Sequence, residues 1–153
     1  MTSAPTTEEL RELYRELILD HAKAPRHFGK LAAPSHQAEG INPLCGDKLK
    51  LYLRLNDTGV IDDITFEGSG CAISVASASL LTETVLGLSA DNALERSAEV
   101  VQSLTGDTVG PQLGKLAALQ GVREFPARVK CATLAWRALD AAISNNNQPA
   151  TTE

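Results

Sequence analysis

KLKLYLRLN, residues 48–56, alternates leucine with charged or polar side chains. A period of two residues is typical of a β-strand with one face buried and the other in water. Asp57-Thr58-Gly59 follows as a turn, and Val60 to Glu67 then predicts the returning strand of a hairpin. Gln37 to Asn42 predicts a further short strand. We therefore expect a small antiparallel sheet of about three strands.

Helices are predicted both before and after these strands along the chain. Thr6-Thr7-Glu8-Glu9 has the pattern of a capping box, and it opens a helix whose apolar face continues to His21 and which stops at Pro25. Gly121 to Lys130 is predicted to be extended, with an interruption at Pro126. Further helices are predicted at Ala72 to Leu86, Ser89 to about Leu104, Gln112 to Leu119 and Cys131 to about Asn145. Because the strands come before most of the helices, the fold class is α+β, with the sheet packed against several helices.

The composition is that of one globular domain. The chain has 153 residues, of which 43% are hydrophobic and 22% charged. We expect a single domain over residues 1–153, ordered over about 6–145, with a flexible tail at 146–153. The net charge of −5, without a dense basic patch, argues against nucleic acid as a partner.

The sequence predicts a cytoplasmic protein that has no membrane segment. Its apolar runs are much shorter than the roughly 20 residues that span a bilayer. Met1-Thr2-Ser3-Ala4-Pro5 lacks the pattern of a signal peptide. An odd number of cysteines in that compartment argues against a disulfide framework and leaves metal or redox chemistry open.

Three cysteines are the candidate reactive groups. Cys45 lies in a polar turn ahead of Gly46, Cys71 precedes the predicted helix 72–86, and Cys131 is predicted to start the last helix. Helix N-termini and cationic neighbours favour the thiolate, which is the form of cysteine that binds metal. Together with Asp47, three thiolates would supply the four donors of a tetrahedral zinc site.

Other interpretations of these residues remain open at this point. A free cysteine is usually a small buried apolar side chain, and the chain has no Cys-x-x-Cys pair. Asp47 could instead cap a turn. Lys130 is either a solvated lysine or a cation that keeps Cys131 ionised or guides an anionic sulfur species. Arg128 has the same alternatives and could pair with Asp47.

Four segments form a recognisable set: Leu13 to His21 with Pro25-Arg26, Asn42 to Asp47, Phe66 to Ser74, and Arg128 to Cys131. Together they resemble the NifU N-terminal/IscU-like family of iron–sulfur cluster assembly proteins, and within it the SufU type. Lys130 stands where IscU proteins carry a histidine. The interval between the second and third cysteines is also longer than in IscU, with the extra residues at about 88–122. Both departures are features of the SufU type.

The resemblance implies a fold, a metal and a partner. The fold would be IscU/NifU-N-like, with Zn²⁺ bound by Cys45, Asp47, Cys71 and Cys131. Cys45 would accept persulfide sulfur from a PLP-dependent cysteine desulfurase of the SufS type, so that the protein acts as a zinc-dependent sulfurtransferase and activates its partner. A SufBCD-type assembly complex is implied as a further partner.

Two other functions fit the same residues. The four ligands could hold a [2Fe–2S] cluster, which would make the protein a scaffold that builds and transfers the cluster. The protein could also be a zinc-stabilised adaptor without sulfur chemistry.

Overall fold

The computed structural model describes residues 7–106, 114–144 and 150–151. The central strand of its sheet is β2 (Asp47–Leu55), which pairs antiparallel with β1 (His36–Asn42) on one side and β3 (Ile61–Ser69) on the other. The short strand β4 (Ala150–Thr151) pairs parallel with β1, which gives the order β3-β2-β1-β4. The prediction of a small antiparallel sheet of about three strands is confirmed.

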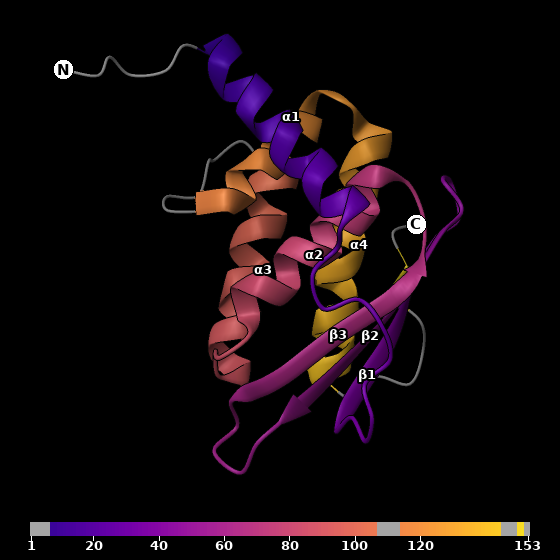
Figure 1. Cartoon of the computed structure of the whole chain (residues 1–153), viewed down its shortest axis with the longest axis vertical. Coiled ribbons are helices and arrows are strands. Elements are labelled where there is room, and N and C mark those ends of the chain that lie inside the picture. The colour runs from indigo at the N-terminus through magenta and orange to yellow at the C-terminus, as the bar shows by residue number, and fades with distance from the viewer. Residues whose placement is uncertain (1–6, 107–113, 145–149, 152–153) are drawn as a thin grey trace, which may run out of the picture.

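The alternating leucines of β2 form the buried face of the sheet. The sheet buries the side chains of Leu49, Leu51 and Leu53 almost completely. The side chain of Lys48, close to the turn between β1 and β2, is exposed. Burying side chains of this size is the main stabilising contribution of such a face. Figure 1 shows the helices gathered on one side of the sheet, so the core lies between them and these leucines.

Two helices pack directly on the sheet, and the other helices form an outer layer. The inner pair is α2 (Ala72–Val85), which contacts β3, and α4 (Pro126–Ile143), which contacts β1 and β2. The outer elements are α1 (Thr7–Lys23), α3 (Ala90–Thr105) and the 3₁₀ helix η1 (Gly114–Glu124). None of the helices in the described ranges has the length and apolar content that crossing a membrane requires.

A buried hydrogen-bonded group holds the inner helices together. Trp136 of α4 is fully buried, and its indole Nε1 donates to Oγ of Ser77 on α2 at 3.1 Å. The Ser77 hydroxyl in turn donates to the backbone carbonyl of Ala132 at 2.6 Å. The polar atoms of this contact are therefore satisfied within the core, which fixes α4 against α2.

The start of α4 corrects the sequence interpretation. Residues 121–130 were predicted to be extended and Cys131 to begin the last helix, but η1 runs to Glu124 and α4 begins at Pro126. Proline is favoured at the first helical position because its missing N–H would be unpaired there in any case. Pro126 thus begins a helix rather than interrupting a strand, and Cys131 lies in the second turn.

The C-terminal residues that the structure describes are paired with the sheet. Ala150 and Thr151 fall in the segment expected to be a flexible tail, yet they form β4 beside Gly40 and Ile41. The rest of residues 145–153 lies outside the described residues. The same holds for Thr6 of the predicted capping box, and α1 begins at Thr7.

Candidate metal centre

Cys45 lies at the tip of the β1–β2 hairpin. The pair Asn42–Asp47 closes the ladder, and the residues between them form the turn. Gly46 has a φ of +70°, a conformation that glycine adopts without steric cost. Cys45 is exposed and the neighbouring Leu44 is 68% exposed. The thiol of Cys45 is therefore accessible to another protein.

Asp47 is buried at the base of the same turn. Its Oδ1 accepts a hydrogen bond from the backbone N–H of Cys71 at 2.8 Å, and its Oδ2 accepts one from Nδ2 of Asn42 at 3.2 Å. A Cβ atom at Gly70 would lie 2.6 Å from Oδ1, so a glycine is required at this position for the carboxylate to fit. Asp47 thus connects the start of β2 to the start of α2.

Cys71 is the N-cap residue of α2, as its predicted place ahead of a helix requires. Its backbone is extended, and its side chain makes no capping hydrogen bond. The thiol is only partly exposed. Its sulfur can therefore turn about χ1 without losing a helix cap.

Cys131 brings the third sulfur to the site from α4. It is buried, and its Sγ lies 3.4 Å from Sγ of Cys45 and 3.5 Å from Nδ2 of Asn42. The ligand atoms of Cys45, Asp47 and Cys131 all lie within 4.8 Å of one another. The structure thus places three of the four predicted ligands together. The sulfur of Cys71 is outside this set, although its thiol is near enough to hydrogen-bond with Cys131.

Burial raises the pKa of the Cys131 thiol, and hydrogen bonds with Asp47, Cys45 and Cys71 raise it further. The sequence interpretation expected a helix N-terminus to favour the thiolate here, but Cys131 lies beyond the first turn of α4, where that effect has faded. A bound divalent cation acts in the opposite direction and deprotonates a coordinating thiol outright. A cation bound at this site would therefore favour the thiolate of Cys131.

Arg128 is an exposed residue in the first turn of α4. Its pKa is raised, first by a hydrogen bond with Cys131 and then by the charges of Cys71, Cys131 and Cys45. Because its side chain is exposed, the guanidinium can also interact with an anion that approaches from solvent. The positive charge of Arg128 therefore acts near the sulfurs, and its pairing with Asp47 stays a prediction.

Lys130, the residue before Cys131 on α4, lies beside a pocket. Its side chain lines an open pocket of about 400 Å³ together with Arg123 and Arg137, between α4, η1 and the end of α3. Its suggested part in sulfur chemistry stays a prediction.

The donor set fits a tetrahedral metal ion. With a zinc–sulfur distance of about 2.3 Å, two sulfurs of a tetrahedral site are about 3.8 Å apart. The sulfurs of Cys45 and Cys131 are 3.4 Å apart, which is close to that sulfur–sulfur distance. Soft thiolates combined with one carboxylate suit zinc and iron better than magnesium or calcium.

Two further residues of the site were missed from the sequence alone. Asn42 contacts Asp47 and Cys131, and Gly70 makes room for the carboxylate. A signal was present for both. Asn42 ends the strand that pairs with the start of β2, and Gly70 directly precedes a candidate ligand.

Comparison with known proteins identifies the family of this chain. The family described as NifU-like N terminal domain matches residues 13–152. The chain is 42% identical over 137 residues to a Bacillus subtilis protein named zinc-dependent sulfurtransferase SufU, covering 88% of this chain and 92% of that protein. It is 39% identical over 141 residues to an iron–sulfur cluster assembly scaffold protein IscU of Streptococcus pyogenes, covering 90% and 87%.

Solved structures extend the comparison to the fold. A SufU crystal structure from Fervidobacterium islandicum superposes with a TM-score of 0.80 at 35% identity, covering 87% of this chain and 98% of that one. A NifU-like protein from Brucella abortus gives a TM-score of 0.77 at 28% identity, covering 88% and 94%. The prediction of an IscU/NifU-N-like fold is confirmed. The chain belongs to the NifU-like N-terminal domain family.

Proposed function

We propose that this protein is a zinc-dependent sulfurtransferase that accepts persulfide sulfur from a SufS-type cysteine desulfurase for iron–sulfur cluster assembly. One observation carries the proposal: the exposed thiol of Cys45 lies 3.4 Å from the buried sulfur of Cys131, beside the buried carboxylate of Asp47. The 42% identity to a protein named zinc-dependent sulfurtransferase supports it. The zinc ligands are Cys45, Asp47, Cys71 and Cys131.

Cys45 is the sulfur acceptor. When bound, zinc keeps the thiols ionised and, being redox-inert, protects them from oxidation. The released thiolate of Cys45 attacks the outer sulfur of the desulfurase persulfide. A bond forms between Cys45 Sγ and that sulfur, and the bond between that sulfur and the cysteine of the enzyme breaks. The electron pair of the broken bond leaves with the enzyme thiolate, so no external oxidant or reductant takes part.

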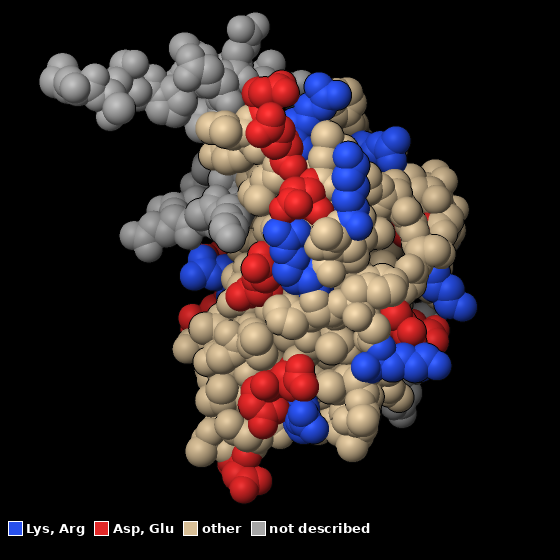
Figure 2. Space-filling model, in the orientation of Figure 1, with Lys and Arg blue, Asp and Glu red and all other residues tan. Residues whose placement is uncertain are grey.

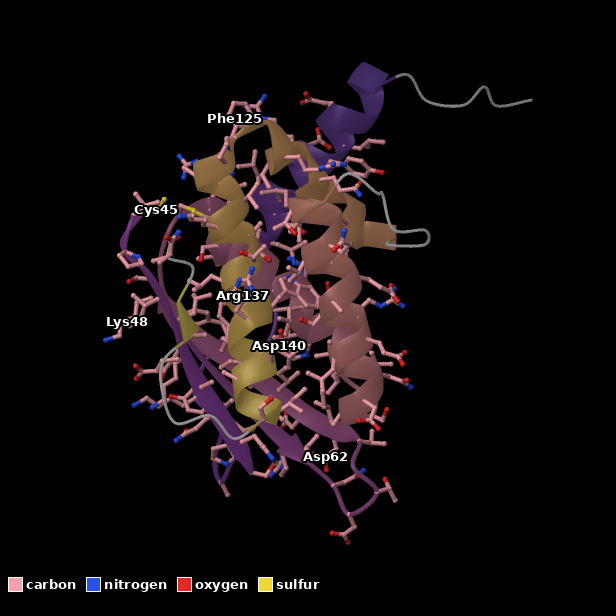
Figure 3. The ribbon with its side chains drawn as sticks, turned by 180° about the vertical axis from the view of Figure 1, so that it is seen from behind. Cys45, Lys48, Asp62, Phe125, Arg137 and Asp140 are labelled. Atoms are coloured by element: carbon pink, nitrogen blue, oxygen red, sulfur yellow. The ribbon has the colours of Figure 1, made fainter. Side chains whose placement is uncertain are left out.

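The rim of the centre is suited to a protein partner. Leu44 is 68% exposed and Phe125 is 58% exposed. Figure 3 shows Cys45 and Phe125 at the same end of the molecule, from the hairpin and from the start of α4. Arg128 adds a positive charge near the sulfurs that attracts an anionic persulfide. This end is therefore the surface that we propose for docking the desulfurase.

The charge distribution favours proteins over nucleic acid as partners. Figure 2 shows acidic and basic side chains interspersed over the face in view, and the net charge of the chain is −5. Delivery of sulfur to a SufBCD-type assembly complex, in the cytoplasm, completes the proposal.

A second candidate function is a scaffold for a [2Fe–2S] cluster. The same donors suit iron, and the relative from Streptococcus pyogenes named as an IscU scaffold protein is 39% identical to this chain. Anaerobic loading with iron and sulfide, followed by transfer to an apo-acceptor, measures this activity. Rapid cluster transfer together with displacement of zinc by iron would favour the scaffold.

Mass spectrometry tests the main proposal. The protein as purified is incubated with a SufS-type desulfurase and cysteine, alkylated and digested. We expect the mass of one additional sulfur atom on the peptide that carries Cys45. An adduct confined to another cysteine, or no adduct while the desulfurase turns over, would contradict the proposal. A sample without cysteine is the control for adventitious sulfur.

A further inference from the structure

Asn42 contacts two of the candidate ligands at once. It is the last residue of β1 and is completely buried. Its Nδ2 donates to Oδ2 of Asp47 at 3.2 Å and to Sγ of Cys131 at 3.5 Å. One amide group therefore links a ligand on β2 to a ligand on α4.

The orientation of this amide follows from its neighbours. A carboxylate and a thiolate are both acceptors, so only the NH₂ group can face them favourably. The opposite atom, Oδ1, is then buried and has no hydrogen-bond partner among the described residues. An unpaired buried carbonyl is unfavourable. A contribution of the NH₂ group to the two ligands would offset that cost.

Three of the four donors differ in how firmly they are held. Asp47 is held by Asn42 and by the backbone N–H of Cys71. Cys131 is buried in the second turn of a helix and contacts Asn42. Cys45, by contrast, lies on an exposed glycine turn. The site thus divides into a firmly held pair and one donor that is free to swing outward.

We propose that Asn42 is a positioning residue that ties Asp47 and Cys131 into one unit, so that the ligand pair keeps its geometry when Cys45 leaves to accept sulfur. This inference rests on the proposed function, because it assigns Cys45 as the departing ligand. The amide N–H places partial positive charge beside a carboxylate and a thiolate, which stabilises both in their ionised, metal-binding form. Hydrogen bonds of this kind typically set the affinity of a metal site as well as the direction of its ligands.

Zinc affinity is the direct test, measured by competition with a chromophoric chelator. Asn42→Ala removes the donor, and we expect a loss of zinc affinity of about 10- to 100-fold. Asn42→Asp keeps the shape but replaces the donor with an acceptor, and we expect a loss at least as large. Ser74→Ala is the matched control, because Ser74 is buried and its hydroxyl has no partner among the described residues. Its zinc affinity should equal that of the wild type.

The same measurement in a Cys45→Ala background separates positioning from packing. In that background Asp47 and Cys131 contribute a larger share of the zinc affinity. Asn42→Ala should therefore lower the zinc affinity by a larger factor than it does in the wild type. An equal or smaller loss would overturn the positioning role, as would an Asn42→Asp variant that binds zinc like the wild type. If Asn42→Ala does not fold, the zinc affinity of Asn42→Asp still tests the positioning role of Asn42. A persulfide that forms elsewhere than on Cys45 would reject the proposed function, whereas these affinities would still report on Asn42.

Discussion

A Cys45→Ala variant is expected to take up no sulfur from the desulfurase and to lose its stimulation of desulfurase turnover, so that the enzyme returns to its basal rate, because the variant lacks the nucleophile. The reason is geometric as well as chemical. Cys45 is the exposed cysteine of the three, whereas Cys131 is buried and Cys71 is partly covered. The measurement is the rate of sulfide release, together with the mass of each cysteine peptide.

The control for this variant is Leu44→Ala. It alters the same exposed turn but leaves the thiol in place, so sulfur uptake should persist even where docking is weakened. Zinc analysis of Cys45→Ala should still find bound metal at high zinc concentration, since Asp47, Cys71 and Cys131 remain. Desulfurase turnover that stays fully stimulated by Cys45→Ala would rule out Cys45 as the acceptor.

Removal of zinc should lower the stability of the whole domain. A ligand present at about 1,000 times its dissociation constant stabilises the folded state by about 4 kcal/mol. For a domain of this size that corresponds to a decrease in Tm of roughly 10 °C or more on chelation. Calorimetry of the protein before and after treatment with a chelator measures the shift.

The loss of stability on zinc removal should begin around the metal site, and it should be reversible. The hydrogen bond between Trp136 and Ser77 lies in the core and does not involve the ligands, so the helical layer should persist without metal. Hydrogen exchange should increase first in the β1–β2 turn and at the start of α2. Zinc should restore the Tm and magnesium should not, because magnesium prefers oxygen ligands. An unchanged Tm after complete metal removal would show that no metal stabilises this fold.

The central hairpin could be predicted from the sequence because its signal is local. The leucines of β2 repeat with the period of a pleated strand, and Gly59 adopts the left-handed conformation, with a φ of +79°, in the turn that the sequence indicated. The helix after Cys71 was predicted for the same kind of reason, since a run of small and apolar residues follows a glycine.

The start of the last helix could not be predicted in this way, because proline fits two local structures. It breaks the interior of a helix but is favoured in the first turn, and only the packing of α4 on the sheet decides between these. The pairing of Ala150 with Gly40 joins segments far apart in the chain and has no local signal.

The candidate site was predictable in its chemistry but not in its geometry. The local settings of the three cysteines and the nearby carboxylate of Asp47 named the four candidate ligands, although the helix N-terminus expected at Cys131 was wrong. The approach of Cys131 to Cys45 depends on how α4 lies against the hairpin, which no spacing in the sequence encodes. The contact of Asn42 with two ligands follows from the same packing and was not foreseen.

X-ray absorption at the zinc edge of the purified wild-type protein tests the ligand set most directly. We predict three sulfur neighbours at about 2.3 Å and one lighter neighbour at about 2.0–2.2 Å from the zinc. Such a spectrum would require the sulfurs of Cys45, Cys71 and Cys131 to meet at one ion with the Asp47 oxygen. A shell of two or fewer sulfurs, or one made of oxygen and nitrogen alone, would contradict the assignment of this centre.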